Sequence, residues 1–127
     1  MASSTWLLIG GLYNLGFAVF HLFFWKIFHW REDLASLTRV NRAVMQVLNL
    51  CLTFVFLMMA YISIVFRTEL SGTELGRTLS LSFAVFWFLR MIEQILFFGL
   101  RHKASSILTV MFLGGSLLYL IPALHGA

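Results

Sequence analysis

Hydrophobic residues run along this chain in four long stretches that short polar segments separate. A helix needs about 20 mainly apolar residues to cross a hydrocarbon core of about 30 Å. The stretches at 6–28, 43–66, 78–100 and 107–124 meet this requirement. Because the connecting segments are short, consecutive helices are expected to be antiparallel. The pattern predicts an all-α fold: a single domain over residues 1–127, built as an up-down-up-down transmembrane four-helix bundle.

Composition strengthens this prediction. Hydrophobic residues make up 61% of the chain and charged residues only 11%, whereas a soluble domain has about a quarter charged residues. The lipid bilayer is therefore the expected partner of most of the surface. Residues 1–5 carry no basic side chain and the first apolar stretch is long, so we expect a retained span rather than a cleaved signal peptide.

Two signals indicate where the helices begin and how the bundle is oriented. Thr38 is expected to cap the second span and Asp33 a short helix before it, while Ser71-Gly72-Thr73-Glu74 fits a capping box before the third. Basic residues flank mainly the first and third connectors, which predicts that these are cytoplasmic and that both termini lie on the outer side. These residues are Lys26, Arg31, Arg39, Arg42, Arg101 and Lys103, against Arg67 and Arg77 on the other side.

We expect a multi-pass protein of a bacterial inner membrane. Trp6, Tyr61 and Tyr119 would then form an aromatic belt at the outer face. The basic residues form no patch large enough to follow a phosphate backbone, so we expect no nucleic-acid partner.

Several polar residues fall inside the predicted spans, where ionisable side chains are costly and usually face the bundle interior. We predict an intramembrane polar cluster in the cytoplasmic half of the bundle. Arg90 and Glu93 are three residues apart, so we expect them to pair. His21, Asn49 and Glu93 lie at a similar depth, roughly 9 to 11 Å from the cytoplasmic ends of their helices. The full set of candidate site residues is Asn14, His21, Gln46, Asn49, Arg90, Glu93 and Gln94.

Two interpretations of the cluster remain open. It can hold the helices together, because polar side chains hydrogen-bond across membrane helices and an Arg90–Glu93 pair would neutralise itself. It can also line a cavity for a lipophilic or amphipathic ligand, or relay protons. The four histidines are scattered with no HxxxH or CxxC spacing, so we predict no metal site.

Two segments resemble the MAPEG family, whose members are small four-helix membrane proteins that use glutathione. Arg39-Val40-Asn41-Arg42-Ala43 is similar to the Arg-rich start of that family's second helix, and a looser likeness covers its later half. The resemblance implies that Arg39, Arg42 and Arg90 bind an anion. Gln46, Asn49, Glu93 and Phe97 depart from the family's pattern at positions that contribute to thiol-cofactor binding. The residues of the looser likeness are Arg90, Phe97, Arg101, Phe112 and Gly114.

The chain also resembles small uncharacterised bacterial four-span membrane proteins. Three functions follow as hypotheses, and enzymatic activity is left open. The first is a non-enzymatic binding or accessory module whose cluster holds the bundle or a ligand. The second is a MAPEG-like enzyme that uses glutathione on lipophilic substrates. The third is a proton-coupled transporter with Glu93 as carrier, which would require a homo-oligomer because four spans enclose little volume.

Overall fold

The structure, a computed structural model that describes residues 3–125, is helical with no strand in that range. Its four long helices are α1 (Ser3–Leu22), α4 (Arg39–Val65), α6 (Glu74–Phe98) and α7 (Lys103–His125). All four are long and apolar enough to cross a bilayer, as in a multi-pass membrane protein. The prediction of an all-helical chain with four long apolar helices is thus confirmed.

All four helices begin three or four residues before the apolar stretch that predicted them, because their first turns are polar. Thr38 caps α4 as predicted, with its hydroxyl accepting a 3.3 Å hydrogen bond from the Asn41 backbone N–H. The predicted capping box at Ser71 is wrong. Thr73 is the N-cap of α6 and accepts from the backbone N–H of Gly76 at 2.9 Å, while Ser71 lies inside α5 (Arg67–Gly72).

The first span is shorter than predicted, because α1 ends at Leu22 rather than near Phe28. Three short elements follow: α2 (Phe24–Ile27), α3 (Trp30–Asp33) and the 3₁₀ helix η1 (Leu34–Ser36). His29 has a left-handed backbone with φ of 52°, which interrupts the helix between α2 and α3. Asp33 closes α3 and makes no capping bond through its side chain, contrary to its predicted role.

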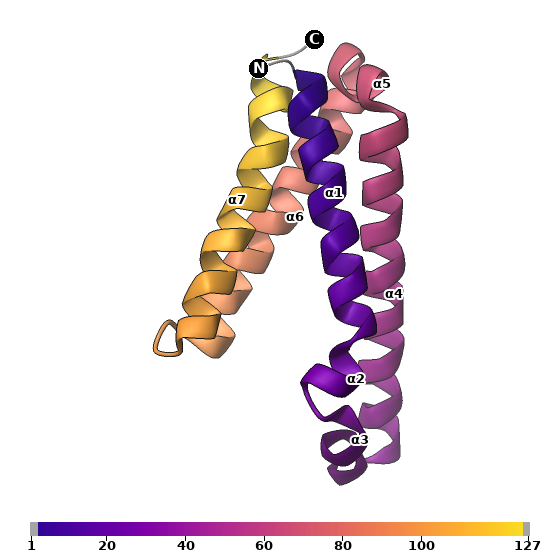
Figure 1. The fold of residues 1–127 in the computed structure, drawn as a ribbon, viewed down its shortest axis with the longest axis vertical. Coiled ribbons are helices and arrows are strands. Elements are labelled where there is room, and N and C mark those ends of the chain that lie inside the picture. The colour runs from indigo at the N-terminus through magenta and orange to yellow at the C-terminus, as the bar shows by residue number, and fades with distance from the viewer. Residues whose placement is uncertain (1–2, 126–127) are drawn as a thin grey trace.

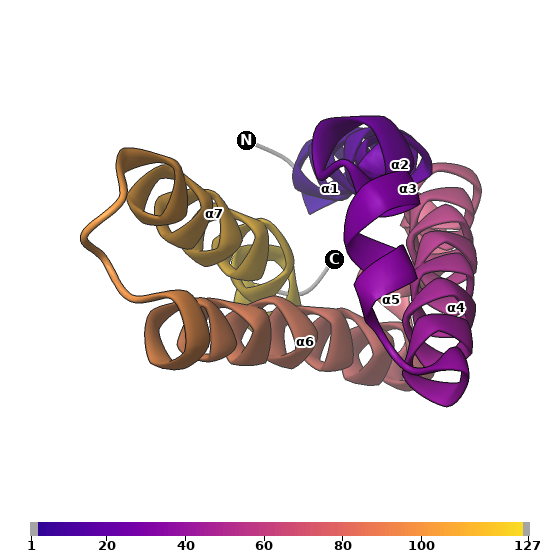
Figure 2. The same ribbon diagram turned by 90° about the horizontal axis from the view of Figure 1, so that it is seen from below.

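The four long helices form two pairs that diverge. Helix α1 packs along α4, and α6 packs along α7. The two pairs meet through α1 and α7 and through α5 at one end of the molecule, called the closed end below. They separate toward the other end, the open end, where α2, α3 and the 99–102 link lie (Figure 1). In the view from the open end, α6 diverges from α4, and α7 lies beside α6 on the same side of the molecule (Figure 2).

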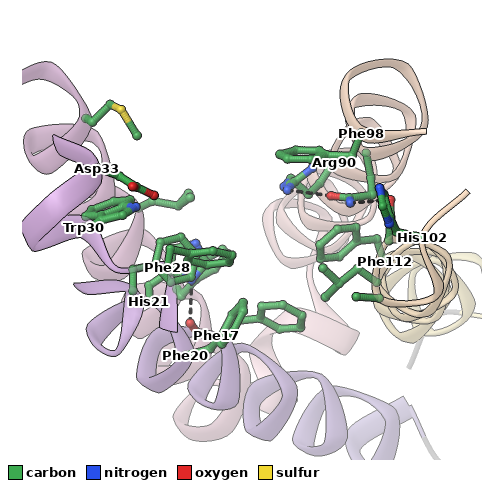
Figure 3. A pocket seen from close by; sticks show the side chains of 18 of the residues that line it. Phe17, Phe20, His21, Phe28, Trp30, Asp33, Arg90, Phe98, His102 and Phe112 are labelled. Atoms are coloured by element: carbon green, nitrogen blue, oxygen red, sulfur yellow. Dashed lines mark hydrogen bonds between the residues drawn. The ribbon is translucent and has the colours of Figure 1, made fainter. Parts of the chain in front are cut away.

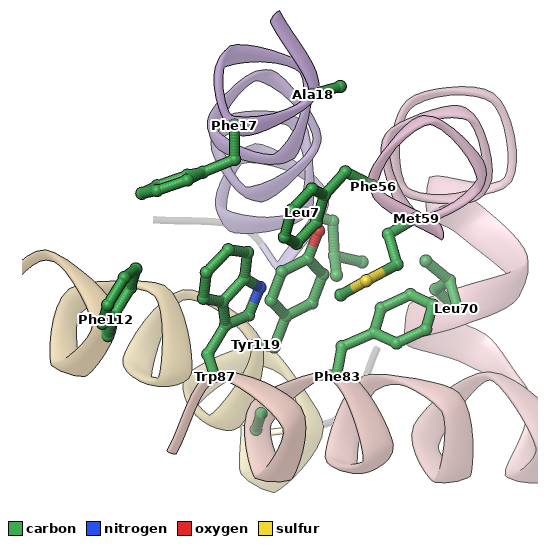
Figure 4. Packing of buried hydrophobic residues seen from close by; sticks show 11 residues of the cluster. Leu7, Phe17, Ala18, Phe56, Met59, Leu70, Phe83, Trp87, Phe112 and Tyr119 are labelled. Atoms are coloured by element: carbon green, nitrogen blue, oxygen red, sulfur yellow. The ribbon is translucent and has the colours of Figure 1, made fainter. Parts of the chain in front are cut away.

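Aromatic side chains fill the core where the two pairs meet. The indole of Trp87 is fully buried. It stacks on Phe56 of α4, with ring centroids 5.2 Å apart, and on Phe112 of α7 at 5.7 Å (Figure 4). Phe17 of α1 packs against all three rings. One aromatic cluster therefore joins all four long helices.

Helices α1 and α7 also interlock through two tyrosine–glycine contacts. A Cβ on Gly10 of α1 would lie 2.8 Å from the ring of Tyr119 on α7. A Cβ on Gly115 of α7 would lie 2.6 Å from the hydroxyl of Tyr13 on α1. Each helix thus presents a glycine where the other presents a tyrosine, which is how small residues allow close packing in membranes. This interlock holds the two helix pairs together near the closed end.

Candidate ligand-binding cleft

A cavity of about 840 Å³ lies between the two helix pairs on the open side of the aromatic core. Figure 3 shows its two walls facing each other: His21, Phe28 and Trp30 on one, and Arg90 and Phe112 on the other. Nine of its 22 lining residues are Phe or Trp, and the lining includes residues of all four long helices and of α2, α3 and η1. The divergence of the two pairs therefore creates a cleft with apolar walls and few polar groups.

The polar groups on the α6–α7 wall form a ladder of hydrogen bonds. Arg90 donates through Nη2 to the side-chain oxygen of Gln94 at 3.0 Å. Gln94 donates to the Ser105 hydroxyl at 2.8 Å, and this hydroxyl donates to the Gly99 carbonyl at 2.6 Å. Gln94 and Ser105 are both buried. The ladder fixes the position of the half-buried Arg90 side chain and joins α6 to the start of α7.

Arg90 is charged and forms no ion pair within the described residues, although the Glu93 carboxylate is near enough to interact with it electrostatically. Its guanidinium carbon lies 4.7 Å from the centroid of the Phe112 ring, a cation–π contact. The predicted ion pair with Glu93 does not form, and over residues 3–125 no acidic side chain pairs with Arg90. Successive helical residues turn by about 100°, so Gln94 lies about 40° from Arg90 and Glu93 about 60° on the other side. Glu93 is accordingly exposed and outside the cleft lining.

Two other predicted residues, His21 and Asn49, meet at the opposite wall, where His21 lines the cleft and Asn49 lies behind the lining. The Asn49 side chain donates to the His21 backbone carbonyl at 3.1 Å and so joins α4 to α1. His21 Nδ1 lies 2.8 Å from the Phe17 carbonyl. Since a carbonyl only accepts, Nδ1 is the protonated nitrogen of this ring. The ring of His21 stacks on Phe24 with centroids 4.2 Å apart.

Asn14 belongs to a different cluster, nearer the closed end. Its side chain donates to the Tyr119 hydroxyl at 2.6 Å, and this hydroxyl lies 2.7 Å from the Ser63 hydroxyl. All three residues are buried. Tyr119 was expected in the outer aromatic belt but packs inside the bundle, because Gly10 leaves space for its ring. The predicted single cluster is therefore divided into three bonded groups: Arg90 with Gln94, His21 with Asn49, and Asn14 with Tyr119 and Ser63. Asn14 is not in the cleft lining.

The remaining predicted residues bond to backbone. Gln46 donates to the Arg42 carbonyl in its own helix at 3.2 Å. Arg42 donates to the carbonyls of Leu34 and Leu37 at 2.8 and 3.1 Å, and also to that of Ala35. Arg42 therefore holds the first connector against the start of α4. Arg39 is exposed on the first turn of α4 and lies outside the cleft lining.

Two features of the cleft were missed in the sequence. Ser105 looks like an ordinary polar residue at the start of a helix, and only the structure brings it to Gln94. The aromatic wall did leave a signal. Phe17, Phe20, Phe24 and Phe28 recur every three or four residues, the spacing of one helical face, and this stripe continues across the break after α1.

Over residues 3–125, no three His, Cys, Asp or Glu side chains gather in a way that could hold a metal ion. Comparison with known proteins finds no matching family model, no matching curated protein and no matching solved structure.

Proposed function

We propose that this protein is a non-enzymatic membrane binding module that takes a lipophilic, amphipathic ligand into the cleft. The observation that carries the proposal is an aromatic cavity of about 840 Å³ with the fixed cation Arg90 in its wall. Pockets for drug-sized molecules have volumes of about 300–1,000 Å³, with mostly apolar walls and a few placed polar groups. The cleft has both properties.

The proposal includes a topology. The four spans alternate in direction, both termini are on the outer side, and the open end of the cleft faces the cytoplasm of a bacterial cell. The excess of basic residues around the first and third connectors supports this orientation. A ligand would then enter from the inner leaflet, between the two helix pairs.

The two alternative functions have less support. A glutathione-dependent enzyme would use Arg42 and Arg90 for its anionic cofactor, but Arg42 donates to three backbone carbonyls instead. A proton carrier at Glu93 would need that carboxylate inside the bundle, whereas it is exposed. Stabilisation of the purified protein by millimolar glutathione in a thermal melt would favour the enzyme instead.

Photolabelling tests the binding proposal. The purified protein in nanodiscs of zwitterionic lipid is irradiated with a diazirine-bearing long-chain fatty alcohol and a diazirine-bearing fatty acid, and labelled peptides are identified by mass spectrometry. We expect saturable labelling of the cleft walls around Phe20 and Leu108, which excess unlabelled probe abolishes.

A matched pair of variants locates the label. Leu108→Trp places a large ring in the cleft, whereas Val110→Trp adds the same ring on the exposed face of α7. We expect Leu108→Trp to reduce cleft labelling severalfold and Val110→Trp to leave it unchanged. Labelling by both probes that is spread over the exposed faces and does not saturate would refute the binding function.

A further inference from the structure

We infer that the ligand carries an anionic oxygen headgroup, a carboxylate or phosphate, on a single acyl chain, and that Arg90 binds this headgroup. This inference rests on the proposed binding function and names the chemical class of the ligand. Three observations carry it: the charge state of the cleft wall, the arrangement of polar and aromatic groups along α6, and the size of the cavity.

Among residues 3–125 no ion pair neutralises Arg90 inside the cleft; the Glu93 carboxylate interacts with it electrostatically from outside the cleft lining and makes no hydrogen bond to it. A guanidinium has five N–H donors, and Arg90 uses Nη2 on the neutral Gln94. Asp33 is the one acidic side chain in the cleft lining; it is exposed and belongs to the connector on the opposite wall (Figure 3). An isolated cation within a membrane span is costly. A carboxylate or phosphate compensates this cost and matches the guanidinium with two parallel hydrogen bonds.

The neighbours of Arg90 hold the guanidinium ready for such a ligand. Phe112 covers one face of the guanidinium, and the bond to Gln94 limits its rotation. Gln94 in turn is fixed by Ser105. Within residues 3–125 Arg90 makes no hydrogen bond other than the one to Gln94, so its remaining N–H groups can donate to a ligand. A pre-positioned cation loses less side-chain entropy when an anion binds.

The cleft-facing side of α6 is polar near the open end and aromatic deeper in the cleft, which matches a ligand with a polar headgroup and an apolar chain. Gln94 and Arg90 are closer to the open end, and Trp87 is almost one turn deeper, against Phe56 and Phe112. A headgroup on Arg90 therefore leaves its chain beside aromatic rings. The cavity of about 840 Å³ lies within the range for one drug-sized ligand, which suits one acyl chain rather than two.

Competition against the photoreactive fatty alcohol tests the headgroup. Palmitate, palmityl alcohol and inorganic phosphate are each added as a competitor of the probe, at an alkaline pH at which the carboxylate of palmitate is ionised. In the wild type we expect palmitate to compete at a concentration at least about tenfold lower than palmityl alcohol, the effect of one charge-assisted hydrogen bond. Inorganic phosphate alone should not displace the probe, because it lacks the chain.

Two arginine variants complete the test. Arg90→Gln should abolish the advantage of palmitate while the alcohol still competes as in the wild type, which also shows that the variant is folded. Arg101→Gln removes an exposed cation outside the cleft lining and should retain the advantage.

Each contrary result has a distinct meaning. Equal competition by acid and alcohol in the wild type, or an advantage that survives in Arg90→Gln, overturns the anionic headgroup. Displacement by inorganic phosphate alone overturns the requirement for an acyl chain. The absence of saturable labelling with either probe instead contradicts the binding function itself, so the two failures are distinguishable.

Discussion

The hydroxyl of Tyr119 connects three helices through one oxygen atom. It accepts from Asn14 of α1 at 2.6 Å and lies 2.7 Å from the Ser63 hydroxyl of α4, while its own backbone belongs to α7. In a membrane such bonds matter because no water can replace them. The residue therefore contributes both a packed ring and a bonding centre to the closed end.

Removing this hydroxyl should destabilise the bundle. We expect Tyr119→Phe to lower the free energy of unfolding by about 1–2 kcal/mol, because Ser63 and one Asn14 donor lose a buried partner. Tyr61→Phe is the matched control, since Tyr61 is exposed on α4. The measurement is unfolding of both variants in detergent with increasing SDS. Equal, small effects of the two substitutions would mean that the network contributes little stability.

The partners of the polar residues could be predicted only in part. Helical spacing placed Arg90, Glu93 and Gln94 near one another, but offsets of three and four residues both suit side-chain pairing. Opposite charge favoured Glu93 as the partner of Arg90. The Arg90 side chain instead bonds with Gln94, because Ser105 of α7 holds Gln94 in place. That third residue is distant in sequence, and nothing in the local pattern indicates it.

At the scale of elements, the four long helices followed from hydrophobicity, but the divergence of the two pairs did not. Exposed apolar residues, such as Leu96 and Phe97, are the same types as those that line the cleft, such as Phe17 and Leu108. Hydrophobicity therefore identifies a membrane-spanning helix but does not predict which face of that helix packs against the other helices. The end of α1 at Leu22 was missed for a related reason, because the apolar run continues through α2.

The interlock of α1 with α7 gives a prediction at this scale. Gly10→Ala puts a methyl group 2.8 Å from the Tyr119 ring, and we expect a loss of about 1–3 kcal/mol from overpacking. Gly16 is on the same helix, and a Cβ added there would have no atom within 4 Å. Gly16→Ala should therefore be neutral or slightly stabilising, since alanine favours helix more than glycine does. Thermal melts in detergent compare them. A neutral Gly10→Ala would show that the two helices can separate without loss.

The whole molecule has one closed end and one open end, and its function depends on which membrane face each occupies. With Cys51 replaced by alanine, Glu69→Cys in α5 and Lys103→Cys at the start of α7 mark the two ends. A membrane-impermeant maleimide added to intact bacterial spheroplasts should label Glu69→Cys, and should label Lys103→Cys only after lysis. The reverse pattern would place the cleft opening outside and contradict the proposed topology.

The tyrosine–glycine interlock also has a consequence for biosynthesis. Helix α1 is synthesised before the other three long helices and α7 after them, yet each supplies half of the interlock. Asn14 and Ser63 enter the membrane long before the hydroxyl they share has been translated. Helices α1 and α4 therefore lack these partners until α7 has been synthesised, and the network can form only after α7 joins them.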